Sequence, residues 1–187
     1  MSTAPTTTEP RLTAEQYAAL PDTGRLDELV RGRIVPVPPP NRRHGIICAK
    51  VARILGDYIE DHDLGHIMIN DAGVITQRDP DTVRGPDLAF YTYAKLPKDA
   101  ILANYGPEVP DLIVEVRSPS ERWPMILAKA AEYLAAGVSV VVILDDERRS
   151  ANVISADGST RMLADDDELA IPEILGDFHV PIQRFFE

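Results

Sequence analysis

The sequence predicts a single α/β domain in which helices flank a mixed central β-sheet. Two segments with apolar residues at helical spacing are separated by runs of β-branched residues typical of strands. Residues 138–146 are almost wholly apolar, as in a strand buried on both faces of a sheet. The chain has 187 residues, which suits one core of ordinary size. Residues 1–11 are rich in Thr and Pro without periodicity, so we expect a disordered tail before one domain over residues 12–187.

The N-terminal part of the domain predicts one short helix and two extra strands. Thr13 followed by Gln16 forms a capping box for a helix that runs to Leu20. Two short segments, RLDELV at 25–30 and RIVPV at 33–37, flank an Arg-Gly pair typical of a tight turn. We therefore expect a pair of N-terminal strands beside the core.

A long helix should follow, because Asn41 can cap a segment whose apolar residues recur at helical spacing as far as about His62. Such an apolar stripe is expected to pack on the sheet. Beyond the helix, we predict strands at 65–70, 73–77 and 86–93, then a loop over 95–110.

The second half of the domain predicts a crossover connection. A strand at 110–116 leads into a helix that ends at Ala136, and the apolar strand 138–146 comes next. A strand, a helix and a buried strand in succession favour two parallel strands joined by the helix. Segments around Asp157-Gly158 predict a C-terminal hairpin, and residues 171–187 a loop with a short terminal helix.

The net charge of -11 argues against a protein that simply coats nucleic acid, because such binding depends on many cation–phosphate contacts. The charge is uneven along the chain, since residues 145–187 carry a net charge of -7 and the stretch Arg25–Arg53 a net charge of +5. A local basic surface can still contact phosphates. A solvated helix face explains the same basic residues equally well.

Two further features limit the class of protein. No run of about 18 apolar residues could span a bilayer, and the first ten residues lack the basic start and apolar stretch of a signal peptide. We therefore expect a cytoplasmic protein with no membrane partner. The single cysteine, Cys48, excludes an internal disulfide and a cysteine-rich zinc site, and is expected to be a small buried residue on a helix.

Glu115 stands inside an apolar strand segment. Strand alternation sends Ile113, Glu115 and Arg117 to one side of the sheet. An ionised carboxylate in such surroundings is costly unless it is paired or binds a metal ion. An ion pair with Arg117 or another cation would explain Glu115 without any catalytic role.

A second acid, Asp87, follows Pro86 at the head of the neighbouring predicted strand. Two carboxylates could therefore converge at one end of the sheet. Oxygen ligands of this kind suit Mg²⁺ or Mn²⁺, which keep several waters that a phosphate can displace. The alternative is that Asp87 is simply a turn residue after proline.

Six segments in a fixed order are informative together: LTAEQYAALPDTGRLDELVRGRIV, PPPNRRHGII, RGPDLAF, PDLIVEVRSPS, KAAEYLAAGV and ILDD. Through these segments, over nearly its whole length, the chain resembles the Uma-type restriction endonuclease family, within the PD-(D/E)xK nuclease superfamily. The resemblance implies a restriction-endonuclease-like core with three layers, α/β/α, and Asp87 and Glu115 as metal ligands. It also implies that Glu28 faces the same site and that Lys129 is the catalytic lysine.

The expected lysine is displaced in this chain. The superfamily usually has its lysine two residues after the strand acid, where this sequence has Arg117. Arginine is essentially never deprotonated, so it could bind phosphate but could not serve as a base. Lys129 precedes Tyr133 by four residues, as the family pattern has it, and borders the apolar face of its helix. Alternatively, Lys129 extends to solvent at the edge of that face.

Five further residues are candidates for contact with the substrate. His44 lies early in the long helix, where the family often has a histidine, although a surface histidine is the plainer explanation. The other four are arginines that could bind phosphate, namely Arg42, Arg43, Arg84 and Arg117. Glu28 also has an alternative role, in which it forms a salt bridge with a nearby arginine.

These features predict a homodimeric endonuclease that hydrolyses phosphodiester bonds in nucleic acid, with DNA as the expected substrate and Mg²⁺ or Mn²⁺ as cofactor. The first alternative is a binding protein that keeps the fold without catalysis. The second is a structural dimer that associates through the apolar strand 138–144 or through the C-terminal segment FHVPIQRFF.

Overall fold

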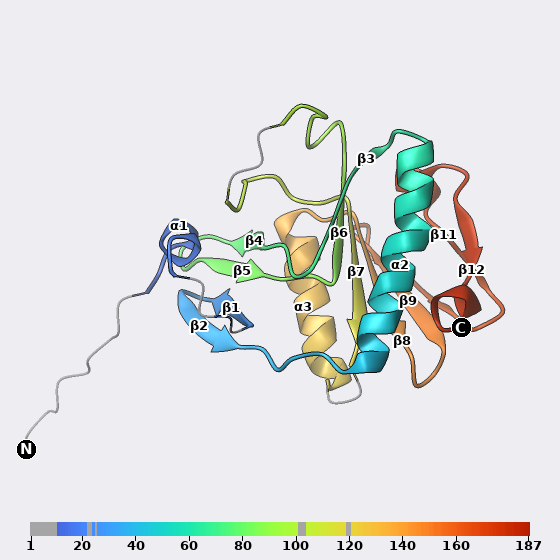
Figure 1. Ribbon diagram of the computed structural model, residues 1–187, viewed down its shortest axis with the longest axis horizontal. Helices are drawn as coiled ribbons and strands as arrows, with labels where there is room; N and C mark the ends of the chain where they lie inside the picture. The colour runs from blue at the N-terminus through green and yellow to red at the C-terminus, as the bar shows by residue number, and fades with distance from the viewer. Residues whose placement is uncertain (1–10, 22–23, 25, 101–103, 119–120) are drawn as a thin grey trace, which may run out of the picture.

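The computed structural model describes residues 11–187 apart from 22–23, 25, 101–103 and 119–120. Residues 1–10 of the predicted tail, and Arg25 of the predicted basic stretch, lie outside the described residues. Helices lie on both faces of a central mixed sheet (Figure 1), which confirms the predicted fold class. None of the helices in the described part of the chain is long and apolar enough to cross a membrane.

The central sheet has six strands in the order β10-β9-β8-β7-β6-β3. Its only parallel pair is β7 with β8, and the other neighbours are antiparallel. Helix α3 connects the parallel pair, so the predicted crossover is confirmed. The strands are β3 (Gly65–Ile69), β6 (Leu88–Thr92), β7 (Leu112–Arg117), β8 (Val140–Asp145), β9 (Ser150–Ser155) and β10 (Thr160–Leu163).

A second, smaller sheet contains the predicted N-terminal strands. Its order is β2-β1-β5-β4, and Figure 1 shows it beside α3, on the opposite side of the molecule from α2. The sequence did not predict β5, because a three-residue strand between a turn and Gly85-Pro86 shows no measurable alternation. The strands are β1 (Asp27–Val30), β2 (Arg33–Pro36), β4 (Val74–Gln77) and β5 (Thr82–Arg84).

Helix α2 (Arg42–Asp61) covers one face of the large sheet. The Asn41 side chain accepts a hydrogen bond from the His44 backbone N–H and so caps the helix as predicted. The apolar stripe is fully buried against the strand residues that point to this face. The stripe consists of Ile47, Val51, Leu55 and Ile59, and its strand partners include Leu88, Phe90, Val114 and Val116.

Helix α3 (Trp123–Ala136) covers the other face. Pro124 lies in its first turn, where the missing N–H is harmless, and the helix ends at Gly137, whose φ of 109° is left-handed. Ile126, Ala130 and Tyr133 are buried against the alternate strand residues. Alternation thus directs Ile113 and Glu115 toward α3 and their neighbours toward α2.

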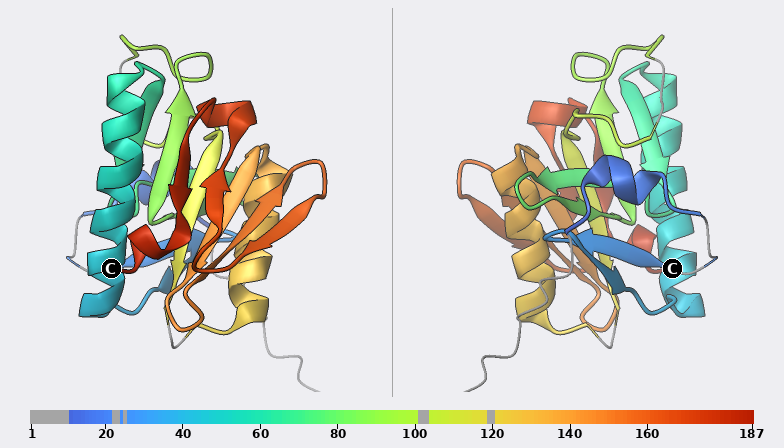
Figure 2. Two further views of the ribbon diagram at one scale, coloured as in Figure 1. Left: turned by 90° about the vertical axis from the view of Figure 1, so that its right-hand side faces the viewer. Right: turned by 90° about the vertical axis from the view of Figure 1, so that its left-hand side faces the viewer.

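The C-terminal segment closes the face that α2 covers. The sequence predicted a loop and a short terminal helix here, and the structure also has a two-stranded sheet of β11 and β12. In the left-hand view of Figure 2 these strands lie in front of the large sheet. Their apolar side chains join the core cluster of α2. The elements are β11 (Glu168–Ala170), α4 (Pro172–Leu175), β12 (His179–Pro181) and the 3-10 helix η1 (Ile182–Phe185), and α1 (Ala14–Ala18) lies at the other end of the chain.

The packing of α2 predicts unequal effects of truncation on its two faces. Leu55→Ala should lower the free energy of unfolding by about 2–5 kcal/mol, because it leaves a cavity in the core. Ile46→Ala on the same helix should change it by no more than about 0.5 kcal/mol, because Ile46 is 50% exposed. Urea unfolding of both variants measures the difference, and equal effects would contradict this packing.

Candidate active site

Glu115 lies in the middle of β7 and is only 5% exposed. The Lys129 Nζ lies 2.9 Å from its Oε1, and the Tyr133 hydroxyl donates a hydrogen bond of 2.9 Å to the same oxygen. Both partners come from α3, one turn apart, because a spacing of four places them on one helix face. Burial raises the pKa of Glu115 to about 7, although the Lys129 ammonium opposes this shift.

Lys129 is the cation at the centre of the site. Besides Glu115, its Nζ lies 3.4 Å from the Glu28 Oε1 and donates a hydrogen bond of 3.1 Å to the Gly85 carbonyl. Burial lowers the pKa of Lys129, but the carboxylates of Glu115 and Glu28 outweigh it and raise that pKa above its usual value. Lys129 therefore extends inward as an ammonium group, and the alternative of a lysine extended to solvent is wrong.

The small sheet contributes Glu28 from β1 and Arg84 from β5. The Arg84 Nη1 lies 2.8 Å from the Glu28 Oε2, and the Gly85 N–H donates to the other oxygen at 3.1 Å. Arg84 also makes two hydrogen bonds of 2.8 Å to Glu132 on α3. Burial raises the pKa of Glu28, but Lys129 and Arg84 lower it by more. Glu28 therefore faces the site, and it also forms a salt bridge with Arg84, of the kind predicted as its alternative role.

Asp87 precedes β6, where Leu88 pairs with Val114, so Asp87 lies beside Glu115 at the same end of the two strands. The Asp87 Oδ2 accepts a hydrogen bond of 2.7 Å from the Val116 backbone N–H. The charge of Asp87 is one cause of the raised pKa of Glu115. The two acids are therefore electrostatic neighbours at one end of the sheet.

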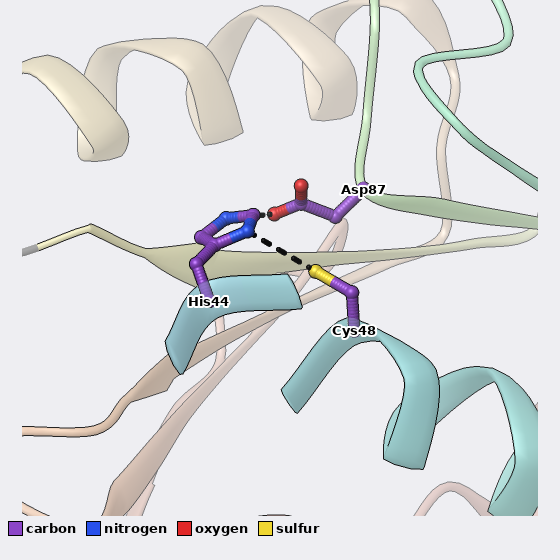
Figure 3. A group of neighbouring side chains, drawn as sticks. All are labelled: His44, Cys48 and Asp87. Atoms are coloured by element: carbon purple, nitrogen blue, oxygen red, sulfur yellow. Dashed lines mark hydrogen bonds and ion pairs between the residues drawn. The ribbon is translucent and has the colours of Figure 1, made fainter. Parts of the chain in front are cut away.

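His44 joins Asp87 to helix α2. Its Nε2 lies 3.3 Å from the Asp87 Oδ2, and its Nδ1 lies 3.4 Å from the Cys48 Sγ, so the imidazole stands between the carboxylate and the thiol (Figure 3). Burial lowers the pKa of His44, but Asp87 and Cys48 raise it to about 10. His44 is thus a positive charge against Asp87 and does not lie free on the helix surface.

Two of the remaining candidate arginines, Arg43 and Arg117, form ion pairs with acidic residues outside the Glu115 cluster. The Arg43 guanidinium makes bidentate hydrogen bonds to the Asp146 carboxylate. The Arg117 Nη2 lies 3.0 Å from the Asp145 Oδ1 and also pairs with Glu147. Of the two alternatives predicted for Glu115, a pair with Arg117 or with another cation, the structure has the second, because Lys129 is the cation beside it. Arg42, in the first turn of α2, is exposed.

Tyr133, Glu132 and Cys48 were not among the predicted site residues. Tyr133 was predicted to be part of the apolar face of its helix, and its spacing of four from Lys129 was the signal that both could reach one carboxylate. Glu132 carried no such signal, because its partner Arg84 belongs to the unpredicted strand β5. Cys48 lies one helical turn after His44, a spacing that places two ligand-type side chains together.

Residues 14–183 match the sequence model of the family Uma2, described as "Putative restriction endonuclease". The chain belongs to the Uma2 family. No curated protein matches the sequence. Among solved structures, this Uma2 chain is similar to one described as a putative nuclease belonging to DUF820 from Anabaena variabilis ATCC 29413. The TM-score is 0.80 at 18% identity, over 94% of this chain and 97% of that one, which shows a shared fold.

The buried pair of this Uma2 protein predicts a strong stability coupling. Lys129→Met should lower the free energy of unfolding by about 3–5 kcal/mol, because it leaves the Glu115 carboxylate without its cation. Adding Glu115→Gln should restore much of that loss, because the remaining group is neutral. A double-mutant cycle by urea unfolding measures the coupling, and additive effects of the two substitutions would contradict it.

Proposed function

We propose that this protein is a metal-dependent endonuclease that hydrolyses phosphodiester bonds in DNA. One observation carries the proposal: a buried carboxylate, Glu115, contacts a lysine ammonium, with Glu28 and Asp87 beside the pair. An acid held in an apolar strand at a cost in desolvation favours a functional role. Membership of a family of restriction-endonuclease type supports the same reaction class.

The chemistry of the donor set fits Mg²⁺ or Mn²⁺. Asp87 and Glu115 offer carboxylate oxygens, the ligand type that these hard cations prefer. The Asp87 contacts described above use Oδ2, and those of Glu115 use Oε1, so the second oxygen of each carboxylate could bind the ion. Glu28 could contribute through a water molecule. When bound, the cation lowers the pKa of an attacking water and neutralises charge on the phosphate.

The protein's own residues would then have distinct roles. Lys129 keeps its proton because its pKa is raised, so it donates hydrogen bonds to the water or to the phosphate oxygens, where negative charge grows in the transition state. Tyr133 and the Gly85 carbonyl fix the position of the Glu115–Lys129 pair. Preorganised donors of this kind act strongly in a site shielded from water.

Substrate binding is proposed for His44 and for the four arginines, of which Arg42 and Arg43 are exposed. Arg43, Arg84 and Arg117 each contact a carboxylate, so a phosphate would compete with that carboxylate for the guanidinium group. Together with the net charge of -11, this competition favours binding that is local and sensitive to salt.

The proposal predicts DNA cleavage that needs both the metal ion and the acid–lysine cluster. Purified protein should cut DNA with Mg²⁺ or Mn²⁺ and not with EDTA. Asp87→Asn and Glu115→Gln should abolish cleavage, because each removes a charged metal ligand. Lys129→Met should slow it by about 10²- to 10³-fold, the usual effect of losing one transition-state donor. A gel assay on supercoiled plasmid measures all four.

Matched controls separate the site from general effects of charge. Lys98→Met removes a lysine whose side chain is 67% exposed and should leave cleavage unchanged. Glu173→Gln removes an exposed acid of α4 and should do the same. Unchanged cleavage by folded Asp87→Asn and Glu115→Gln would reject the proposed site, and no cleavage of any DNA or RNA substrate would reject the function.

A binding protein without catalysis is the second candidate, and the exposed pair Arg42 and Arg43 at the start of α2 favours it, because these residues could contact phosphate without a metal ion. The two candidates differ in metal binding. Calorimetric titration of the nuclease with Mn²⁺ should show a site that Asp87→Asn removes, whereas a pure binding protein should show none. Heat of binding that Asp87→Asn and Glu115→Gln both leave unchanged would contradict the nuclease.

Homodimer formation is part of the nuclease proposal, because cleavage of both DNA strands requires two sites. Sedimentation velocity should therefore detect a dimer with DNA or at high protein concentration. A strictly monomeric protein would contradict the homodimer. The structural dimer predicted as an alternative has no free apolar surface in either of its two described segments, because β8 is buried between β7 and β9 and the apolar side chains of FHVPIQRFF join the core.

A further inference from the structure

His44, Cys48 and Asp87 form a cluster of three potential metal ligands, and the Cys48 thiol has no role in the proposed hydrolysis. One ligand atom from each residue lies within 4.8 Å of the others. His44 and Cys48 are one turn apart on α2, and Asp87 reaches them from the start of β6 (Figure 3). The His44 and Asp87 side chains are 11% and 16% exposed, so the cluster is partly shielded from solvent.

The separation of the two helix residues suits a chelating pair. The Nδ1 of His44 and the Sγ of Cys48 are 3.4 Å apart. In a tetrahedral zinc site, bonds of about 2.0 Å to nitrogen and about 2.3 Å to sulfur place two such ligands about 3.5 Å apart. A cation could therefore bind both atoms with little rearrangement of the helix.

The other ring nitrogen of His44 faces a carboxylate, as in many metal-binding histidines. The Nε2 lies 3.3 Å from the Asp87 Oδ2, so an Nε2–H can donate to that oxygen, and loss of the second ring proton would leave Nδ1 free to bind a cation beside Cys48. Asp87 in turn accepts a backbone hydrogen bond from Val116, which fixes the carboxylate. Asp87 thus either orients His44 or, after a small shift, binds the cation itself.

We propose that His44 and Cys48, completed by Asp87, form a second metal site that takes Zn²⁺ or a similar borderline cation. A thiolate and an imidazole select such ions over Mg²⁺, which prefers oxygen ligands. Binding forms a metal–sulfur and a metal–nitrogen bond. The thiol proton of Cys48, and any second proton on the imidazole, leave to solvent.

The second site has a consequence for catalysis that rests on the proposed nuclease function. Asp87 belongs to both metal sites, because its Oδ2 faces His44 and its other oxygen is the proposed Mg²⁺ ligand, so a zinc ion bound to His44 and Cys48 would repel Mg²⁺ beside Glu115. Zn²⁺ should therefore inhibit Mg²⁺-dependent cleavage. Cys48→Ser should retain cleavage and lose the inhibition, because Cys48 contacts His44 and is not needed for the Mg²⁺ site.

Cobalt titration of the full chain tests the site without any assay of activity. Co²⁺ bound to a thiolate gives a charge-transfer absorption, and Cys48 is the single cysteine of the chain, so that band reports this residue alone. The wild-type protein should show the band with one Co²⁺ per chain, and Zn²⁺ should displace it. Cys48→Ser should abolish the band, and Asp87→Asn should weaken Co²⁺ binding by about 10- to 100-fold.

His62→Ala is the matched control, because His62 lies at the other end of α2 and contacts the Tyr58 carbonyl, so the band should persist. Absence of the band in the wild-type protein would overturn the second site, whether or not the protein is a nuclease. A band of full strength in folded His44→Ala would also overturn it. A normal band with no cleavage of nucleic acid would keep the second site and reject only the nuclease function.

Discussion

The contact between Glu115 and Lys129 is the interaction on which the rest of the site depends. It joins the central strand β7 to helix α3, and both side chains are buried enough that neither charge is tolerable alone. The crossover connection brings them together, because the helix that joins the parallel strands β7 and β8 packs back on the face of the sheet toward which Glu115 points. The Tyr133 hydroxyl, one turn from Lys129, then fixes the same carboxylate oxygen.

The small sheet and α2 complete the site from opposite sides. Glu28 and Arg84 continue the network of ion pairs from Lys129 to Glu132, so that negative and positive side chains alternate between the small sheet and α3. On the side of α2, His44 balances Asp87. Glu115, Glu28 and Asp87 thus each have a positive partner, which explains how a chain with a large negative net charge can keep these three carboxylates together.

The sequence predicted the helices and strands whose apolar residues recur regularly, and it also predicted the charged residue that interrupts an apolar strand. The stripe of α2, the apolar strand β8 and the isolated acid Glu115 each follow from local pattern, and the family resemblance led to Lys129. What failed were features decided by tertiary contacts. The strand β5 is too short for a pattern, and the choice between Arg117 and another cation as the partner of Glu115 depends on how α3 packs on the sheet.

The central claim is that Asp87 and Glu115 bind a divalent cation beside the Lys129 ammonium. The most direct measurement is anomalous X-ray diffraction from crystals of the wild-type protein soaked in Mn²⁺. We expect a manganese peak in contact with one oxygen of each carboxylate, and no such peak in Glu115→Gln crystals. If crystals soaked in Mn²⁺, at a concentration that saturates known Mn²⁺ enzymes, show a well-ordered site with no manganese between Asp87 and Glu115, that result would contradict the account.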